Sequence, residues 1–141
     1  MESLTVKAPA KINWYLNVLK KRSDGYHDIE TVMQTVDIYD TLTFTKTDSK
    51  DIRIRIDNNI YNIDCGSNNL IYKAAEALGV YGVDICVEKN IPVEAGLGGG
   101  SSDAACTLKT LNSMFELGFS REQLASKAAS IGADVPFFVY G

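Results

Sequence analysis

Residues 92–105 constrain this chain most: they read PVEAGLGGGSSDAA, and four of these fourteen residues are glycine. Glycine loses more backbone entropy on ordering than any other residue, so this density predicts a loop rather than the interior of a helix or strand. Two hydroxyl residues follow, and we predict that Ser101 or Ser102 caps a helix with Asp103 in its first turn. The expected buried stripe of that helix is Ala104, Ala105, Leu108, Leu111 and Phe115.

A glycine-rich loop that leads into a helix is typical of an anion site, because the first N–H groups of a helix have no partner within it. We therefore interpret the segment as a phosphate cradle; the alternative is a flexible turn ahead of an ordinary core helix. Two common phosphate-binding patterns are excluded. No lysine follows the last glycine, as the Walker A pattern requires, and Ser101 stands where the dinucleotide pattern needs its last glycine.

Composition limits the class of protein. A chain of 141 residues with 45% hydrophobic and 23% charged residues is typical of one globular domain. The net charge of −4 and the pI of about 4.9 argue against a nucleic-acid or anionic-membrane partner. Three widely spaced cysteines indicate free thiols in a reducing compartment. Neither a signal peptide nor a membrane-length apolar run is apparent, so we expect a cytoplasmic location.

Alternating apolar residues predict strands at 4–8 and 12–19, separated or kinked at residues 9–11, and then at 29–39, 41–45, 51–57 and 83–87. Helices are expected at 70–78, with Asn69 as its cap and Gly79 as its stop, and at 121–131, with a capping box from Ser120 to Gln123. The apolar run at 137–140 predicts a final strand. Arg53 and Arg55 are expected to face solvent.

Read by themselves, the other candidate residues have ordinary explanations. Lys11 would be an exposed lysine at a strand kink, and Asp134 a carboxylate in a turn. Tyr26 and His27 form either a solvated surface pair or a stacking platform with a hydrogen-bonding group for a flat ligand.

Three segments together resemble the N-terminal half of the GHMP kinases, the superfamily of galactokinase, homoserine kinase, mevalonate kinase and phosphomevalonate kinase. They are PAKIN at 9–13, the glycine loop with Ala104 and Ala105, and GADVP at 132–136. The resemblance implies an α+β fold like domain 2 of ribosomal protein S5, with helices against a mixed sheet. It also implies ATP and Mg²⁺ as cofactors.

Residues 22–27 (RSDGYH), 30–34 (ETVMQ) and 69–71 resemble the branch of this family that makes isoprenoid precursors by the non-mevalonate route. The implied reaction is ATP-dependent phosphorylation of the 2-hydroxyl of 4-diphosphocytidyl-2-C-methyl-D-erythritol, a cytidine diphosphate-linked polyol. Two alternatives remain open. One is another small-molecule kinase of the family, acting on homoserine or a sugar. The other is a non-catalytic anion- or RNA-binding module on the same fold.

Carried over by position, the resemblance implies a role for each site residue. Lys11 and Asp134 would be the catalytic pair, with Asp134 taking the proton of the attacking hydroxyl and Lys11 orienting it. Tyr26 would stack on cytidine, His27 would hydrogen-bond to it, and Asn13 would touch the polyol. Asn69, Leu70 and Ile71 would hold adenine. The phosphates would be wrapped by Pro92, Val93, Glu94, Ala95, Gly96, Leu97, Gly98, Gly99, Gly100, Ser101 and Ser102.

No dedicated carboxylate cage for the metal is apparent, so Mg²⁺ is expected with ATP, through Ser102. Members of the family carry a second, C-terminal domain with a further glycine-rich motif, which residues 1–141 do not contain. We therefore expect residues 1–141 to be the N-terminal, ATP-binding domain of a GHMP kinase, with low or no activity alone. The missing domain contact is expected to expose apolar surface and to favour a homodimer.

Overall fold

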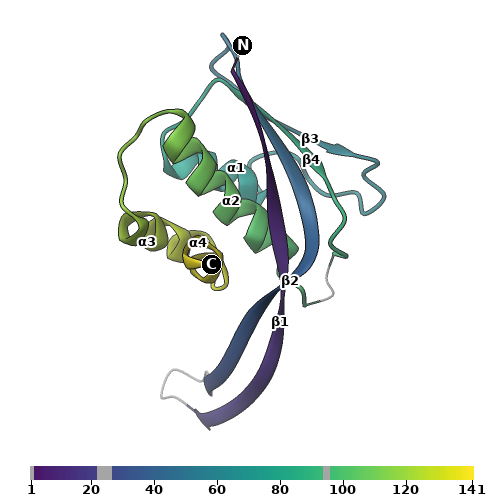
Figure 1. Ribbon diagram of the computed structural model, residues 1–141, viewed down its shortest axis with the longest axis vertical. Helices are drawn as coiled ribbons and strands as arrows, with labels where there is room; N and C mark the ends of the chain where they lie inside the picture. The colour runs from purple at the N-terminus through teal and green to yellow at the C-terminus, as the bar shows by residue number, and fades with distance from the viewer. Residues whose placement is uncertain (1, 22–26, 94–95) are drawn as a thin grey trace.

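Within its described part, the chain folds into a four-stranded mixed sheet covered on one face by helices (Figure 1). The computed structural model describes residues 2–21, 27–93 and 96–141, and it describes residues 14–21 and 27–31 by their backbone alone. This arrangement confirms the predicted α+β class with a mixed sheet. In chain order the elements are β1 (Ser3–Lys21), β2 (His27–Lys46), β3 (Ile52–Asp57), α1 (Leu70–Ala77), β4 (Val83–Glu88), α2 (Gly99–Met114), α3 (Arg121–Ile131) and α4 (Val135–Tyr140).

The strand order in the sheet is β1-β2-β4-β3. β2 pairs antiparallel with both β1 and β4, whereas β3 pairs parallel with β4, so α1 lies in the crossover between two parallel strands. Arg53 and Arg55 are exposed on the outer face, as predicted. Because side chains alternate along a strand, the intervening residues of each strand point to the helices. The buried ones include Leu42, Phe44, Val83, Ile85 and Val87.

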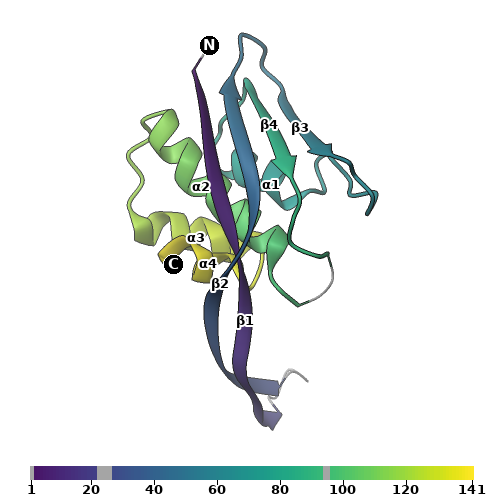
Figure 2. The same ribbon diagram turned by 45° about the vertical axis from the view of Figure 1, so that its right-hand side comes forward.

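β1 is one long strand rather than two, and β2 likewise joins the two strands predicted at 29–39 and 41–45. At the predicted break the structure has a register shift: Pro9 lies opposite Tyr39, but Ala10 lies opposite Val36. Proline has no N–H to donate to the ladder, and a bulge accommodates that gap without ending the strand. Beyond this shift the β1–β2 ribbon extends away from the helices (Figures 1 and 2).

The start of α2 differs from the prediction. The helix begins at Gly99 and its N-cap is Gly98, so the predicted cap at Ser101 or Ser102 is wrong and Asp103 lies beyond the first turn. Packing explains the difference. A Cβ atom at Gly99 would lie 3.0 Å from Cγ2 of Ile91, so the helix start rests directly on a buried side chain. This contact requires glycine and outweighs its entropic cost in a helix.

The predicted final strand is also wrong, because residues 135–140 form the short helix α4. Val135, Phe138 and Val139 are buried, at the three- and four-residue spacing of a helix face. Pro136 lies in the first turn, where a helix tolerates a residue without an N–H group. Figure 2 shows α4 beside α3 and against α2, on the same side of the sheet.

The other helix boundaries follow the sequence. Asn69 caps α1 by accepting a 2.8 Å hydrogen bond from the Ile71 N–H, and Gly79 follows the helix at φ +69°. Ser120 and Gln123 form the predicted capping box of α3. Among the described residues, no helix combines the length and the apolar character needed to cross a membrane.

Candidate active site

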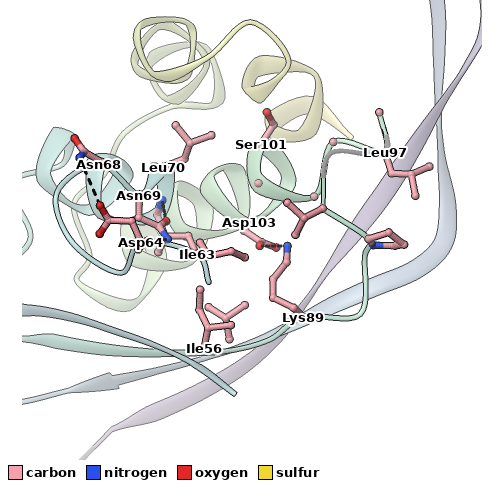
Figure 3. Close-up of a pocket in the computed structure, with 18 residues that line it drawn as sticks. Ile56, Ile63, Asp64, Asn68, Asn69, Leu70, Lys89, Leu97, Ser101 and Asp103 are labelled. Atoms are coloured by element: carbon pink, nitrogen blue, oxygen red, sulfur yellow. Dashed lines mark hydrogen bonds and ion pairs between the residues drawn. The ribbon is translucent and has the colours of Figure 1, made fainter. Parts of the chain in front are cut away.

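A cavity of about 420 Å³ opens between the glycine loop, the start of α1 and the segment that follows β4 (Figure 3). It brings together the two predicted nucleotide-binding segments, although they are far apart in the sequence. Of the predicted residues, Glu94 and Ala95 lie outside the described part of the chain, and Ser102 is buried and does not line the cavity. Those that do line it are Asn69, Leu70, Ile71, Pro92, Val93, Gly96, Leu97, Gly98, Gly99, Gly100 and Ser101.

One end of this cavity is built to accept an anion. Gly98 has φ +73°, a left-handed conformation that favours glycine, and none of the described side chains caps the helix there. The first hydrogen bond of α2 runs from the Ser102 N–H to the Gly98 carbonyl at 2.8 Å. The N–H groups of residues 99–101 therefore have no partner in the helix, and they stand at the positive end of its dipole.

The other end is an apolar slot with a polar rim. Ile56, Ile63 and Leu70 line it, and Asp64 and Asn69 lie at its edge (Figure 3). The Asn69 side chain is already engaged: its amide group donates a 2.8 Å hydrogen bond to the Asp64 carbonyl while its oxygen caps α1. Asn69 thus fixes the shape of the slot. An apolar slot beside an anion-binding helix start suits a nucleotide, whose flat base and phosphates need these two environments.

Lys11 and Asp134 lie together beside the glycine loop. Lys11 Nζ is 4.0 Å from Asp134 Oδ2, and their side chains are 6% and 43% exposed. The interpretation of Lys11 as an exposed lysine is therefore wrong. Its Cγ would lie 3.0 Å from a Cβ atom at Gly98, so the lysine packs directly against the loop. Asp134 is the N-cap residue of α4, but its side chain caps no helix N–H and is available to Lys11.

α4 is held against α2, which fixes the position of Asp134. The ring of Phe138 would lie 3.0 Å from a Cβ atom at Gly98, so only glycine leaves room for it. The Lys109 ammonium group donates a 2.9 Å hydrogen bond to the Phe138 carbonyl near the end of α4. Burial lowers the pKa of Lys109. Phe138 therefore joins α4 to α2 twice, through its ring and through its carbonyl group.

The predicted substrate-binding residues are not all brought to this place. Asn13 lies in β1, two residues beyond Lys11, and its backbone pairs with Met33. His27 is the first residue of β2 and lies opposite Lys21 of β1. The length of strand between Lys11 and Lys21 is about 30 Å at the usual rise per residue. The side chain of His27 and all of Tyr26 lie outside the described residues.

A resident metal site is not visible in the described part of the chain, where no group of three His, Cys, Asp or Glu side chains gathers. Ser102 Oγ is buried and has no hydrogen-bond partner among the described residues. A cation bound in this cavity would therefore take most of its ligands from phosphate oxygens and water, which is how Mg²⁺ commonly binds with nucleotides.

Sequence reasoning missed a cluster of three charged residues at the cavity. Lys89 lines it and forms ion pairs with Asp40 in β2 and Asp103 in α2. The sequence did contain an indication that Asp40 is buried, because Asp40 lies on the same face of its strand as the inward-facing Leu42 and Phe44. A charged residue at an inward position of a strand requires a buried partner.

Known proteins resemble this chain along its length. The GHMP kinases N terminal domain model matches residues 69–141. A 4-diphosphocytidyl-2-C-methyl-D-erythritol kinase of Geobacter metallireducens is 47% identical over 100% of this chain and 51% of its own length. The Thermodesulfovibrio yellowstonii protein of that name is 51% identical over 97% of this chain and 48% of its own length.

Among solved structures, the crystal structure of a 4-(cytidine 5'-diphospho)-2C-methyl-D-erythritol kinase matches with a TM-score of 0.79 and 37% identity. The match covers 98% of this chain and 49% of that one. The chain spans about half the length of the curated relatives it matches.

Proposed function

Because this chain belongs to the GHMP kinase N-terminal domain family, we propose that residues 1–141 form the ATP-binding part of a 4-diphosphocytidyl-2-C-methyl-D-erythritol kinase. The relatives that bear this name, at 47% and 51% identity, support the proposal. The reaction would be ATP-dependent phosphorylation of the 2-hydroxyl of that substrate in isoprenoid precursor biosynthesis. The proposal places the protein in the cytoplasm.

One observation carries the proposal: the Lys11–Asp134 pair lies against the uncapped start of α2. Phosphoryl transfer needs little covalent chemistry from the protein, but it needs positioned charge and a group that takes the proton of the attacking hydroxyl. These requirements are met by a carboxylate and a lysine that lie side by side, next to free helix N–H groups. ATP, with Mg²⁺ on its phosphates, supplies the phosphoryl group when bound.

Each residue of the pair has a distinct task in this proposal. The Asp134 carboxylate accepts the proton of the substrate hydroxyl, so that the hydroxyl oxygen is free to attack. The Lys11 ammonium group orients that carboxylate and offsets negative charge as it develops near the transferred phosphate. The N–H groups of residues 99–101 hold the phosphates, and the slot beside Ile56 and Leu70 takes the base.

The direct test is a substrate panel with the full-length protein. ADP release is measured with ATP and Mg²⁺ in the presence of 4-diphosphocytidyl-2-C-methyl-D-erythritol, homoserine or galactose. We expect ADP release above background with the cytidine compound alone, and product analysis should locate the phosphate on its 2-hydroxyl. Equal or faster turnover of homoserine or galactose would instead assign the chain to another branch of the family. Binding of RNA without turnover of any small molecule would overturn the enzymatic assignment.

A further inference from the structure

A buried ion cluster lies beneath the glycine loop, apart from the Lys11–Asp134 pair. It consists of Lys89, Asp40 and Asp103, whose side chains are 8%, 0% and 3% exposed. Lys89 Nζ donates to Asp40 Oδ2 at 2.5 Å and to Asp103 Oδ2 at 3.0 Å. Figure 3 shows Lys89 and Asp103 pointing toward each other at the cavity. The cluster joins β2, the segment after β4, and α2.

The same cluster holds the backbone on both sides of the loop. Asp40 Oδ1 accepts hydrogen bonds from the N–H groups of Asn90 at 2.8 Å and Ile91 at 2.9 Å, which fixes the segment leading into the loop. Ile91 in turn supports the helix start at Gly99. Lys89 Nζ itself would lie 3.2 Å from a Cβ atom at Gly99. Lys89 therefore packs against the first residue of α2, which lines the cavity.

Lys89 lines the cavity beside the glycine loop, but its ammonium group is already paired with two carboxylates. Two buried carboxylates share one ammonium group, so with both ionised the cluster carries a formal charge of −1. A cluster of that charge does not attract phosphate. An ammonium group with two carboxylate partners would also lose strong hydrogen bonds if it turned to a ligand.

We propose that Lys89 is a positioning residue for the phosphates of the nucleotide, acting through Asp40 and Asp103, and that Asp103 carries a proton so that the cluster is neutral. This proposal rests on the proposed function, because it concerns the same phosphate-binding loop. Lys89 clamps the loop entrance to the first turns of α2. The N–H groups of residues 99–101 are thereby held in the arrangement that an anion requires.

The proton on Asp103 is supported by its surroundings. Asp103 Oδ1 is buried and has no hydrogen-bond partner among the described residues. Burial raises the pKa of Asp103, Lys89 opposes this rise, and the neighbouring Asp40 adds to it. The titratable groups that face Asp103 are Lys89 after β4, Asp40 in β2 and Cys106 in α2 itself. The buried thiol of Cys106 is neutral at physiological pH, since burial raises its pKa to about 11.

The test compares variants of the full-length protein by calorimetry with a non-hydrolysable ATP analogue and by steady-state kinetics. Lys89→Met keeps the apolar stem and removes the charge. We expect it to weaken analogue binding and raise the KM for ATP by about tenfold or more, because small displacements at a binding loop are costly. We expect kcat at saturating ATP to fall by less than about threefold, since Lys11 and Asp134 are untouched. Lys73→Met, at an exposed position of α1, is the matched control and should change neither quantity.

Asp103→Asn and Asp40→Asn distinguish the contributions of the two carboxylates to analogue binding. Asparagine has the shape of a protonated carboxyl group, so Asp103→Asn should bind the analogue within about threefold of the parent. Asp40→Asn should behave like Lys89→Met, because it removes the one carboxylate charge that the neutral cluster requires. If Lys89→Met does not fold, the two asparagine variants and Lys89→Arg, which retains the charge and should recover most of the affinity, decide the question.

Several outcomes would overturn the proposal. Unchanged analogue affinity in Lys89→Met would do so, as would a loss of about tenfold or more in Asp103→Asn. A fall in kcat with unchanged KM would indicate that the cluster only keeps the protein folded. Failure of the proposed function is distinguishable: the parent would then bind the ATP analogue but would not phosphorylate the cytidine compound.

Discussion

The backbone N–H of Lys11 donates a 2.8 Å hydrogen bond to the carbonyl oxygen of Leu97. This bond ties β1 to the glycine loop at the residue whose side chain also approaches Asp134. The side chain of Lys11 packs on Gly98, the next residue of the loop. The candidate catalytic pair and the candidate phosphate cradle are therefore in direct contact, and a change at Gly98, where they meet, is expected to affect both.

Gly98→Ala tests this connection. The position has φ +73°, and a Cβ atom there would lie 3.0 Å from both Lys11 Cγ and Phe138 Cζ. We expect the free energy of unfolding to fall by about 2–4 kcal/mol, from left-handed strain and overpacking together. We also expect binding of an ATP analogue to weaken by about tenfold or more. Urea denaturation and calorimetry measure the two effects.

The matched control is Gly118→Ala. Gly118 has a similar φ of +76°, but a Cβ atom there meets nothing within 4 Å. It should lower the free energy of unfolding by about 1–2 kcal/mol, the cost of the backbone conformation alone, and leave analogue binding unchanged. Equal effects of the two substitutions would show that the contacts of Gly98 with Lys11 and Phe138 contribute nothing.

Lys11→Met and Asp134→Asn should separate chemistry from binding. In the full-length protein we expect each to lower kcat by about 10²–10⁴-fold, because proton transfer by a positioned group contributes that much. Analogue affinity should change by less than about threefold. The double variant should lose little more than the more impaired single variant, since residues that act as a unit are not additive. Single-turnover and steady-state rates provide the measurement.

Exposed residues of the same types serve as controls for this pair. Lys7→Met lies on the same strand as Lys11, and Asp48→Asn lies in the turn after β2; both positions are exposed. Neither should change kcat. Near-parental turnover of Asp134→Asn would exclude Asp134 as the group that takes the proton.

The sequence was informative where local rules decide the structure. Strand alternation, the Asn69 cap and the Ser120 capping box all depend on neighbours in the chain, and the structure confirms them. Local rules failed where distant packing decides. α2 has its N-cap at Gly98, three or four residues before the predicted caps Ser101 and Ser102, because Ile91 supports Gly99. α4 is a helix although its aromatic and β-branched residues favour a strand.

The same distinction between local rules and distant contacts applies to the candidate site. The glycine loop could be interpreted as a phosphate cradle from its residues, because the free N–H groups belong to one segment. Nothing in residue spacing could pair Lys11 with Asp134, which was expected from family resemblance alone. The cluster of Lys89, Asp40 and Asp103 was missed because its members come from three elements that meet only in the folded chain.

Ser120→Ala should destabilise the protein without affecting activity. Ser120 Oγ accepts a 3.1 Å hydrogen bond from the Gln123 N–H at the start of α3. Loss of such a cap lowers the free energy of unfolding by about 1 kcal/mol. Ser126→Ala, the same substitution at an exposed interior position of α3, should instead raise it by a few tenths of a kcal/mol, because alanine has the higher helix propensity. Urea denaturation distinguishes the opposite signs, and effects of equal sign would contradict the capping role.

Cys106 should make stability depend on alkaline pH. Burial raises the pKa of its thiol to about 11, and a hydrogen bond with Thr110 opposes this rise. An unfolded cysteine ionises near pH 8.5–9. Between about pH 9 and pH 11 the folded state therefore holds a proton that the unfolded state releases, so the free energy of unfolding falls as pH rises. The full effect is about 3 kcal/mol, from roughly 1.4 kcal/mol for each pKa unit.

Comparison with Cys106→Ala isolates this contribution from other groups that titrate at high pH. The free energy of unfolding is measured by urea denaturation at pH 7.5 and pH 10.5 for both proteins. At pH 7.5 the variant should be the less stable, because it leaves a small cavity in the core. At pH 10.5 the parent should have lost about 2 kcal/mol more than the variant, since its buried thiol resists ionisation until the chain unfolds. An identical loss in the two proteins would mean that the Cys106 thiol ionises as readily in the folded chain as in the unfolded one.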